Sequence, residues 1–170
     1  FRLAVGGLAL VVDDVDQRTV RIVAHRRLRE RHQTLRRAGV ATAVDCPADL
    51  VLTSYPGAWS QILSNLISNS LVHGFTPGQT DAQIHIALAD TPTESVLTYR
   101  DNGRGMDDAV AAKVFDPFFT TNRQGGGTGL GMHVVYNLVS QKLGGRIQLQ
   151  TAPGQGAVFT CHLPKQLASP

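Results

Sequence analysis

The sequence contains few cysteines, and their positions support neither a disulfide framework nor a metal centre. Cys46 and Cys161 are the only two in 170 residues, and neither lies at the spacing of a zinc or redox motif. Isolated thiols of this kind are typical of a reducing compartment, so we expect a cytoplasmic protein. A disulfide between the two has no support in the sequence.

Long hydrophobic runs are also missing. The apolar stretch at residues 3–12 is too short to cross a bilayer and lacks a signal-peptide cleavage pattern, so we expect it to pack at a domain edge. With 42% hydrophobic residues the chain can form one compact core. We therefore predict a single domain over residues 1–170, with an edge segment at 1–16, a core at 17–164 and a tail at 165–170.

Charged residues make up only 17% of the chain, and the basic excess is confined to one segment. Residues 18–37 contain eight arginines and one glutamate, whereas the rest of the chain has more acidic than basic residues. Apolar residues at helical spacing among these arginines predict an amphipathic helix over residues 17–37, ending before Gly39. A nucleic-acid-binding helix is the alternative. Because no aromatic residues alternate with the charges, we favour a solvated face and expect no nucleic-acid partner.

The remaining secondary structure predicts two layers. Alternating residues indicate strands at 40–45 and 50–54, interpreted as a small hairpin, and at 83–89, 95–100, 146–151 and 157–163. Helical spacing indicates helices at 58–73, at 107–114 and from 130 to the glycine pair at 144–145. Antiparallel hairpins dominate. The expected fold is therefore an α/β (α+β) two-layer sandwich, in which about three helices cover one face of a mixed, mostly antiparallel sheet.

The helix at 58–73 has a polar edge beside its apolar face. Gln61, Asn65, Asn69 and His73 follow one another at intervals of four residues and therefore lie on one flank. Asparagine is a mediocre helix former, so two of them here call for an explanation. Either they bridge neighbouring backbone groups, or their amide oxygens face a cleft and bind a hard cation such as Mg²⁺, completed by water and phosphate oxygens.

Two glycine-containing segments follow. DNGRGMD at residues 101–107 places a carboxylate at a strand end, where it can accept a hydrogen bond from an amine such as adenine N6. Alone, this segment is also a common tight turn. FDPFFTTNRQGGGTGLGM at residues 115–132 joins an aromatic cluster to a glycine-rich loop and a helix start. Such a loop lets backbone N–H groups converge on an anion, and a flexible surface loop is the alternative.

Taken in order, QILSNLISNSLVHG, DNGRGMD, VFDPFFTT and GGGTGLGM resemble the N, G1, F and G2 boxes of the ATP-binding catalytic domain of bacterial sensor histidine kinases. The resemblance covers roughly residues 55–163. PFFTT favours the histidine-kinase branch over the gyrase, Hsp90 and MutL relatives that share the fold. The resemblance implies a Bergerat fold of the GHKL ATPase/kinase superfamily, with ATP and Mg²⁺ as cofactors.

The resemblance also implies roles for individual residues. Asn69 is expected to be the principal Mg²⁺ ligand, Asn65 to lie near the phosphates or the water shell of the metal, and Asp101 to bind the adenine amine. Gly103 and Gly105 would shape the base pocket, and Phe118 and Phe119 would anchor a lid. Gly127, Gly129 and Gly131 would hold the triphosphate. The implied ATP-binding residues are Asn65, Asn69, His73, Asp101, Gly103, Gly105, Met106, Phe118, Phe119, Gly125, Gly126, Gly127, Thr128, Gly129, Leu130 and Gly131.

The chain departs from the family pattern after the second asparagine. The family often has a lysine or arginine there for the phosphates, whereas this chain has Val72 and His73. His73 either offers a ring N–H to the phosphates or has a helix-end role. Related families that hydrolyse ATP have a glutamate at the position of Asn65, whose amide cannot act as a base. We therefore expect poor hydrolysis and a domain suited to phosphoryl transfer.

No histidine matches the phosphoacceptor motif of the family, in which an acidic residue follows the histidine. His25 is followed by an arginine and His32 by a glutamine, so neither has an acidic neighbour there. His85 and His162 lie in predicted strands, and His133 lies in the helix after the glycine loop. We expect a catalytic fragment that donates the γ-phosphoryl group of ATP to a histidine on a dimerisation domain of the same parent, and then to a response regulator.

We further expect the isolated domain to be a monomer, attached to a membrane only through a parent protein. An anti-sigma-factor-like serine kinase is the alternative enzyme on the same fold. A degenerate nucleotide-binding interaction module is the non-enzymatic alternative.

Overall fold

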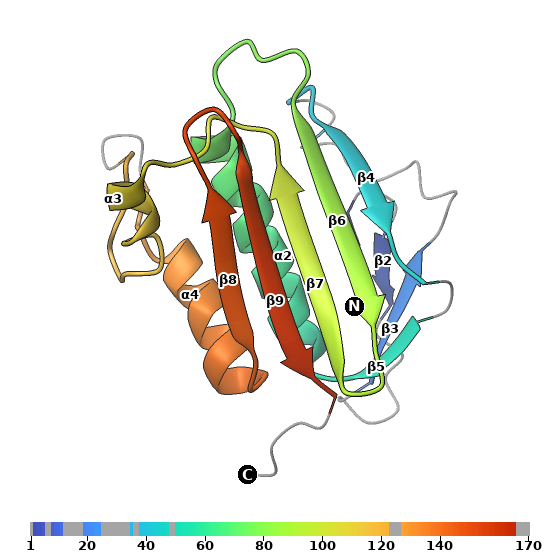
Figure 1. Cartoon of the computed structure of the whole chain (residues 1–170). Helices are drawn as coiled ribbons and strands as arrows, with labels where there is room; N and C mark the ends of the chain where they lie inside the picture. The colour runs from blue at the N-terminus through green and yellow to red at the C-terminus, as the bar shows by residue number, and fades with distance from the viewer. Residues whose placement is uncertain are drawn as a thin grey trace.

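Two sheets form the framework of the computed structural model, which describes residues 2–5, 8–11, 19–24, 35, 38–47, 50–122 and 127–165. The first sheet is antiparallel, with strands in the order β1 (Arg2–Val5), β2 (Leu8–Val11), β3 (Thr19–Ala24) and β5 (Leu50–Thr53). The second contains β4 (Ala41–Asp45), β6 (Gln83–Asp90), β7 (Glu94–Asp101), β9 (Ala157–Pro164) and β8 (Arg146–Thr151), in that order (Figure 1). Because β4 and β6 are parallel and the other pairs antiparallel, this five-stranded sheet is mixed and mostly antiparallel, as predicted.

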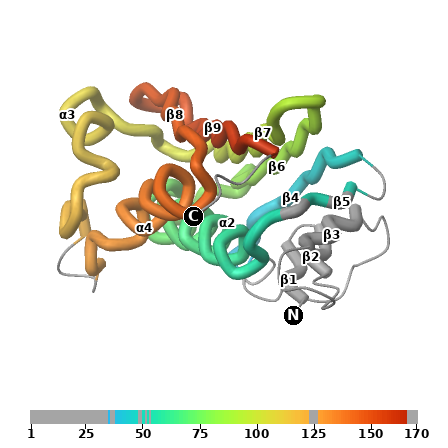
Figure 2. Tube along the Cα trace, turned by 90° about the horizontal axis from the view of Figure 1, so that it is seen from below, coloured from blue at the N-terminus to red at the C-terminus, as the bar shows by residue number. Residues whose placement is uncertain are grey.

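Two main helices cover one face of the five-stranded sheet. α2 (Pro56–Asn69) continues into a π-helical turn at Ser70–Gly74, and α4 (Gly131–Asn137) continues into another at Leu138–Lys142. Seen from below, both helices lie on the same side of the sheet, and α3 (Asp108–Ala111) is a single turn at one end (Figure 2). The two-layer sandwich expected from the sequence is confirmed.

The core lies between these helices and the sheet. Trp59, Ile62, Leu63 and Leu66 of α2 are each at most 2% exposed, as the three- and four-residue spacing requires. The facing strands alternate between buried and more exposed residues. Their buried apolar side chains are Ile84, Ile86, Leu88, Leu97, Tyr99, Phe159, Cys161 and Leu163. This packing fixes the ends of α2, β7 and α4 relative to one another.

The predicted basic helix over residues 17–37 is wrong at residues 19–24. Thr19–Ala24 is strand β3, paired with β2 on one side and β5 on the other. The segment TVRIVA is rich in β-branched residues, which favour a strand once neighbouring strands are available. Leu35 is helical, and residues 17–18, 25–34 and 36–37, with the solvated face assigned to the arginines, lie outside the described residues.

The predicted hairpin of residues 40–45 and 50–54 is also wrong, although both strands exist. β4 pairs in parallel with β6, while β5 belongs to the other sheet. A parallel pair needs a long crossover connection, and β5 and α2 supply it here. Over the ranges that the structure describes, no helix is long and apolar enough to cross a membrane.

Candidate functional site

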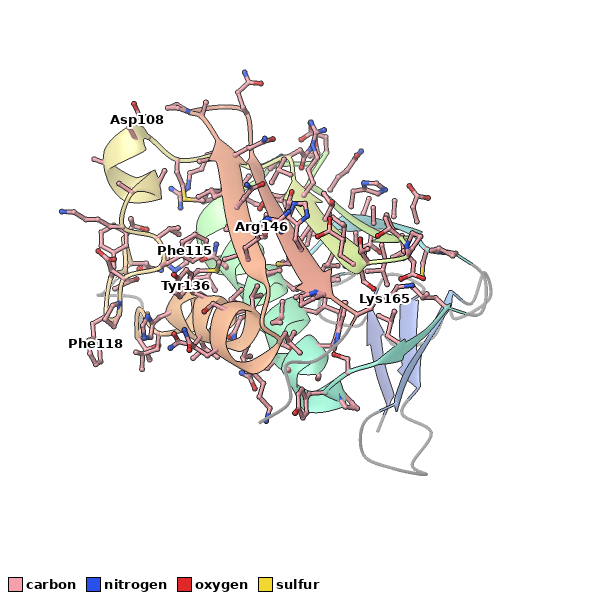
Figure 3. All side chains as sticks on the ribbon, turned by 60° about the horizontal axis from the view of Figure 1, so that its bottom comes forward. Asp108, Phe115, Phe118, Tyr136, Arg146 and Lys165 are labelled. Carbon is pink, nitrogen blue, oxygen red and sulfur yellow. The ribbon has the colours of Figure 1, made fainter. Side chains whose placement is uncertain are left out.

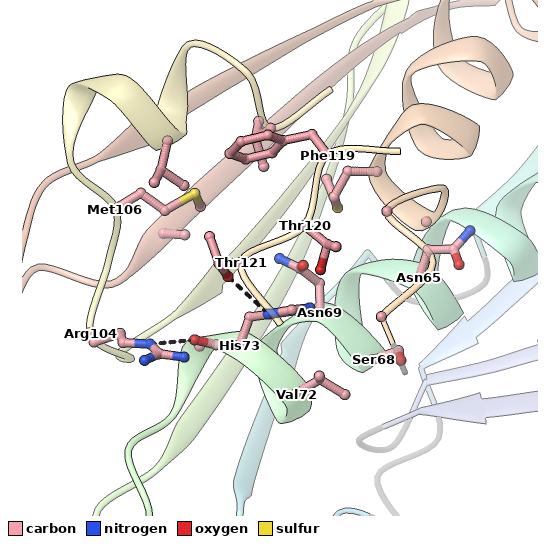
Figure 4. Close-up of a pocket in the computed structure, with 18 of the residues that line it drawn as sticks. Asn65, Ser68, Asn69, Val72, His73, Arg104, Met106, Phe119, Thr120 and Thr121 are labelled. Atoms are coloured by element: carbon pink, nitrogen blue, oxygen red, sulfur yellow. Dashed lines mark hydrogen bonds between the residues drawn. The ribbon is translucent and has the colours of Figure 1, made fainter. Parts of the chain in front are cut away.

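An open pocket of about 550 Å³ lies at one end of the sandwich (Figure 4). The C-terminal end of α2, the turn after β7, α3 and the N-terminal end of α4 contribute its walls. Its lining residues are Asn65, Ser68, Asn69, Val72, His73, Gly74, Asp101, Arg104, Gly105, Met106, Asp107, Val110, Val114, Phe119, Thr120, Thr121, Gly127, Thr128, Gly129, Gly131, Met132 and Ala157. Most of the residues singled out in the sequence are therefore brought together in one cavity.

Asp101 lies at one end of the pocket, 3% exposed, where its carboxylate is held by three donors. Oδ1 accepts from the backbone N–H groups of Gly103 at 3.0 Å and Ala157 at 3.2 Å. Oδ2 accepts from the hydroxyl of Ser70 at 2.6 Å. Because these donors come from three different segments, the orientation of the carboxylate is fixed before any ligand binds.

A buried hydroxyl pair supports Asp101 from beneath. Ser70 lies in the π-helical turn after α2, and its Oγ accepts a hydrogen bond from Tyr99 Oη at 2.8 Å. Burial raises the pKa of Tyr99, and the Asp101 charge adds to this effect while the Ser70 hydrogen bond opposes it. The phenol therefore remains protonated and acts as a donor.

The two asparagines of the polar edge of α2, Asn65 and Asn69, lie elsewhere in the pocket. Asn69 points into the pocket beside Thr120, and Asn65 lies one turn earlier, near the start of α4 (Figure 4). A Cβ on Gly131 would be 3.5 Å from Asn65 Oδ1. Among the described residues, Asn65 Nδ2 is buried without a hydrogen-bond partner. Buried polar atoms are normally paired, so this unsatisfied donor indicates a place for a ligand or water oxygen.

His73 links the end of α2 to two other walls. Its Nδ1 lies 3.2 Å from Thr121 Oγ1, and its backbone carbonyl accepts a hydrogen bond from Arg104 Nε at 2.6 Å. Burial lowers the pKa of His73, and the Arg104 charge lowers it further. A neutral ring is therefore favoured, and the helix-end role has direct structural support.

Apolar side chains form the sides of the pocket between the polar groups. They include Met106, Val110, Val114, Phe119 and Met132. Phe119 points toward the cavity from the segment before the glycine loop (Figure 4). These surfaces suit the faces of a flat aromatic ring whose edge reaches a polar group.

Three predicted site residues are not among those that line the cavity. Gly103 lies next to Gly74, whose carbonyl a Cβ at position 103 would overlap, so this glycine permits close backbone packing. Phe118 is 65% exposed and has a φ of 63°, and it lies at the edge of the molecule (Figure 3). Leu130 is 37% exposed and comes directly before α4. Gly125 and Gly126 lie outside the described residues.

Sequence reasoning missed several functional candidates. Arg104, Thr120 and Thr121 lie inside recognised motifs, so their positions were available as a signal. Ser70 also lies inside a recognised motif, but the motif does not indicate its partner, and Tyr99 lies outside the motifs. Their pairing with Asp101 depends on a contact between a helix end and a strand 29 to 31 residues away in the chain.

Comparison with known families agrees with this geometry. The family model for histidine kinase-, DNA gyrase B- and HSP90-like ATPases matches residues 55–167. The chain therefore belongs to this family of ATPases. Membership implies that the domain binds ATP.

Within the family the chain resembles sensor histidine kinases. Sensor protein DivL of Caulobacter vibrioides is 34% identical over 161 residues, which are 94% of this chain and 20% of DivL. A nucleotide-free catalytic domain of histidine kinase ThkA has a TM-score of 0.65 and 25% identity, covering 77% of this chain and 84% of that domain. ThkA in complex with response regulator protein TrrA has a TM-score of 0.61 and 22% identity, covering 80% and 37%.

These likenesses confirm the predicted resemblance: the chain is a catalytic domain of the histidine-kinase type. It spans only a fifth of the length of DivL.

Proposed function

We propose that the pocket binds Mg-ATP and presents the γ-phosphoryl group to a histidine on a separate dimerisation domain of the same parent protein. The observation that carries this proposal is the division of one cavity between two kinds of polar group. Asp101 offers an acceptor for a base amine, whereas Asn65 and Asn69 stand together with a glycine-containing wall. This polarity matches a nucleotide, with its amine at one end and its phosphates at the other.

The groups beside Asn69 fit a magnesium ion held mainly through a nucleotide. In the described part of the chain, no cluster of three histidine, cysteine, aspartate or glutamate residues could hold a metal by itself. Mg²⁺ accepts one or two protein oxygens when waters and phosphate oxygens complete its octahedron. Asn69 is the proposed ligand, with Asn65 toward the phosphates. The bound ion would neutralise charge on the phosphate oxygens.

The pocket favours positioning over hydrolysis. The two carboxylates that line it are both engaged: Asp101 accepts three hydrogen bonds, and Asp107 accepts one from the Val110 N–H at 2.8 Å. Asn65 stands where a water-activating base would be needed, and an amide cannot take a proton at neutral pH. Catalysis would therefore depend on holding the phosphoryl group in place for an external nucleophile.

The histidines of the described residues have other partners. His133 contacts the Phe115 carbonyl at 3.0 Å, His85 contacts Asp45 at 2.8 Å, and His162 contacts Glu94 at 3.1 Å. His25 and His32 lie outside the described residues. An acceptor histidine on a separate domain is therefore part of the proposal. A response regulator would be the next partner, by analogy with the ThkA–TrrA complex.

A titration with a non-hydrolysable ATP analogue, with and without Mg²⁺, tests the cofactor assignment. We expect Mg²⁺ to raise the affinity of the wild type for the analogue. In Asn69→Ala this increase should be smaller by about tenfold or more, whereas the affinity without Mg²⁺ should be unchanged. Asn137→Ala on α4, outside the lining of the pocket, is the control. An Asn69→Ala variant with an unchanged Mg²⁺ effect would contradict the assignment.

The transfer reaction needs its own measurement. The wild type should hydrolyse ATP slowly alone, and should label the histidine-bearing domain of its parent when γ-labelled ATP is supplied. Rapid hydrolysis without that domain would show that the pocket activates water, contrary to the proposal.

A further inference from the structure

A chain of three buried polar groups lies at the end of the pocket that contains Asp101, which is the end proposed to hold the base. Tyr99 Oη donates to Ser70 Oγ at 2.8 Å, and Ser70 Oγ donates to Asp101 Oδ2 at 2.6 Å. Tyr99 and Ser70 are 0% exposed and Asp101 is 3% exposed. Of these three, Asp101 alone lines the cavity. Tyr99 and Ser70 can therefore affect a ligand only through the carboxylate.

The direction of these hydrogen bonds follows from the number of protons. Each hydroxyl carries one proton, and an ionised carboxylate only accepts. Ser70 gives its proton to Asp101, so its oxygen is left to accept from Tyr99. Tyr99 retains its proton because burial disfavours the phenolate. The two hydroxyls thus form a chain of hydrogen bonds in which each group donates toward Asp101 Oδ2. We call this pair the Tyr99–Ser70 relay.

The hydrogen bonds of the Asp101 carboxylate leave one acceptor position for a ligand. A carboxylate has about four lone-pair positions. The Gly103 and Ala157 N–H groups occupy those of Oδ1, and Ser70 occupies one of Oδ2. A Cβ on Gly74 would lie 3.5 Å from Oδ2, so the glycine leaves this side uncovered. One acceptor position on Oδ2 remains toward the pocket.

We infer that the Tyr99–Ser70 relay is a specificity device that makes Asp101 select a purine bearing an amine, rather than a carbonyl, at C6. This inference rests on the proposed binding of an adenine nucleotide. Because Ser70 donates to one position of Oδ2, the carboxylate is held in one orientation, with its remaining position left to accept from the ligand. A 6-oxo purine would place its own acceptor against Oδ2 and leave both groups unpaired. Ser70 and Tyr99 are positioning residues.

Selectivity between ADP and inosine diphosphate tests the relay, because a general loss of structure weakens both ligands together. In titrations of the whole chain, Ser70→Ala should lower the ADP preference by about tenfold, the usual effect of losing a hydrogen bond to a charged group. Tyr99→Phe should lower it by about threefold, since Ser70 remains but is no longer oriented. Phe at this position keeps a ring opposite Phe159, whose centroid lies 6.5 Å from that of Tyr99.

Ser95→Ala is the matched control, because Ser95 is also buried on β7 and donates to a carboxylate, Asp90, at 2.9 Å outside the pocket. Its selectivity should equal that of the wild type. If Ser70→Ala and Tyr99→Phe fold and keep the wild-type preference while binding ADP, the relay is overturned and the proposed function stands. If Ser70→Ala does not fold, Tyr99→Phe decides in the same way. A wild type that binds neither nucleotide would overturn both.

Discussion

The two ends of the pocket differ in how completely their polar groups are paired. At the end proposed to hold the base, Asp101, Ser70 and Tyr99 are at most 3% exposed, and the hydrogen bonds of the carboxylate leave one position toward the cavity. At the other end, Asn65 Nδ2 is buried without a partner among the described residues, and Thr121 and Thr128 are exposed. One end is rigid and preorganised, and the other carries a buried donor that is still to be paired.

This difference has a physical consequence for ligand binding. A preorganised acceptor costs little to order when the base arrives, so its contribution appears directly as affinity and selectivity. A buried donor without a partner is unfavourable until a ligand oxygen or water reaches it. The end proposed to hold the phosphates should therefore gain order and stability when nucleotide binds, whereas the end proposed to hold the base should change little.

The largest expected effect comes from Asp101→Asn. The substituted amide removes a charged acceptor from three donors and offers one acceptor atom instead of two. We expect AMP and ATP binding to weaken by the same factor, about 100-fold, and the free energy of unfolding to fall by about 1–3 kcal/mol. Calorimetric titration and thermal unfolding measure the two effects.

Asp45→Asn is the control, because Asp45 is a carboxylate on β4 that lies outside the lining of the pocket, 2.8 Å from His85 Nε2. If Asp101→Asn weakened ATP much more than AMP, the assignment of Asp101 to the base end would be wrong.

The second effect should be confined to the phosphate end. Gly129 has a φ of +67°, and a Cβ there would overlap the backbone of Phe118, so Gly129→Ala must displace the glycine-containing wall. We expect ATP to bind about tenfold more weakly, with AMP binding within about twofold of the wild type. Titration with both nucleotides gives the comparison.

Gly154→Ala separates backbone strain from crowding. Gly154 has a φ of +75°, but an added methyl group there would meet nothing within 4 Å, in the turn between β8 and β9. This variant should lose about 1 kcal/mol of unfolding free energy and keep both nucleotide affinities. Equal losses of AMP and ATP binding in Gly129→Ala would show that the two ends are not independent.

The parts of the fold that the sequence predicted share a continuous local period. α2 has its apolar residues at helical spacing, and the β6–β7 and β8–β9 hairpins alternate over nearly their whole length. In the same way, Asp101 and the two asparagines lie in linear motifs, and the structure places all three in one pocket.

The parts that were missed depend on long-range contacts. Strand β3 forms at residues 19–24 because β2 and β5 flank it, and no local pattern reveals these neighbours. Ser70 reaches Asp101 from a π-helical turn, which the apolar spacing of α2 does not distinguish from a continuing α-helix. Phe118 and Phe119 are adjacent and chemically identical, but the backbone at Phe118 adopts positive φ, and only Phe119 of the two lines the cavity.

The smallest expected effect concerns His73, which joins the end of α2 to the wall containing Thr121. Burial and the Arg104 charge lower its pKa, so folding favours the neutral ring. Its contribution to stability is therefore fully present above about pH 6.5, the value of an unperturbed histidine, and is lost as pH falls toward the lower pKa of the folded state. The loss should stay below about 1 kcal/mol, because His73 is only partly buried and solvent screens Arg104.

Thermal unfolding of the wild type and His73→Gln between about pH 8 and about pH 5 measures this effect, since the other histidines titrate in both proteins. The wild type should lose more stability on acidification than the variant, and Arg104→Gln should reduce that difference. Parallel curves for the wild type and His73→Gln would mean that the ring is not held neutral by its surroundings. The link between the helix end and Thr121 would then contribute no pH dependence, and the contrast between the two ends of the pocket would rest on Asp101 and the asparagines alone.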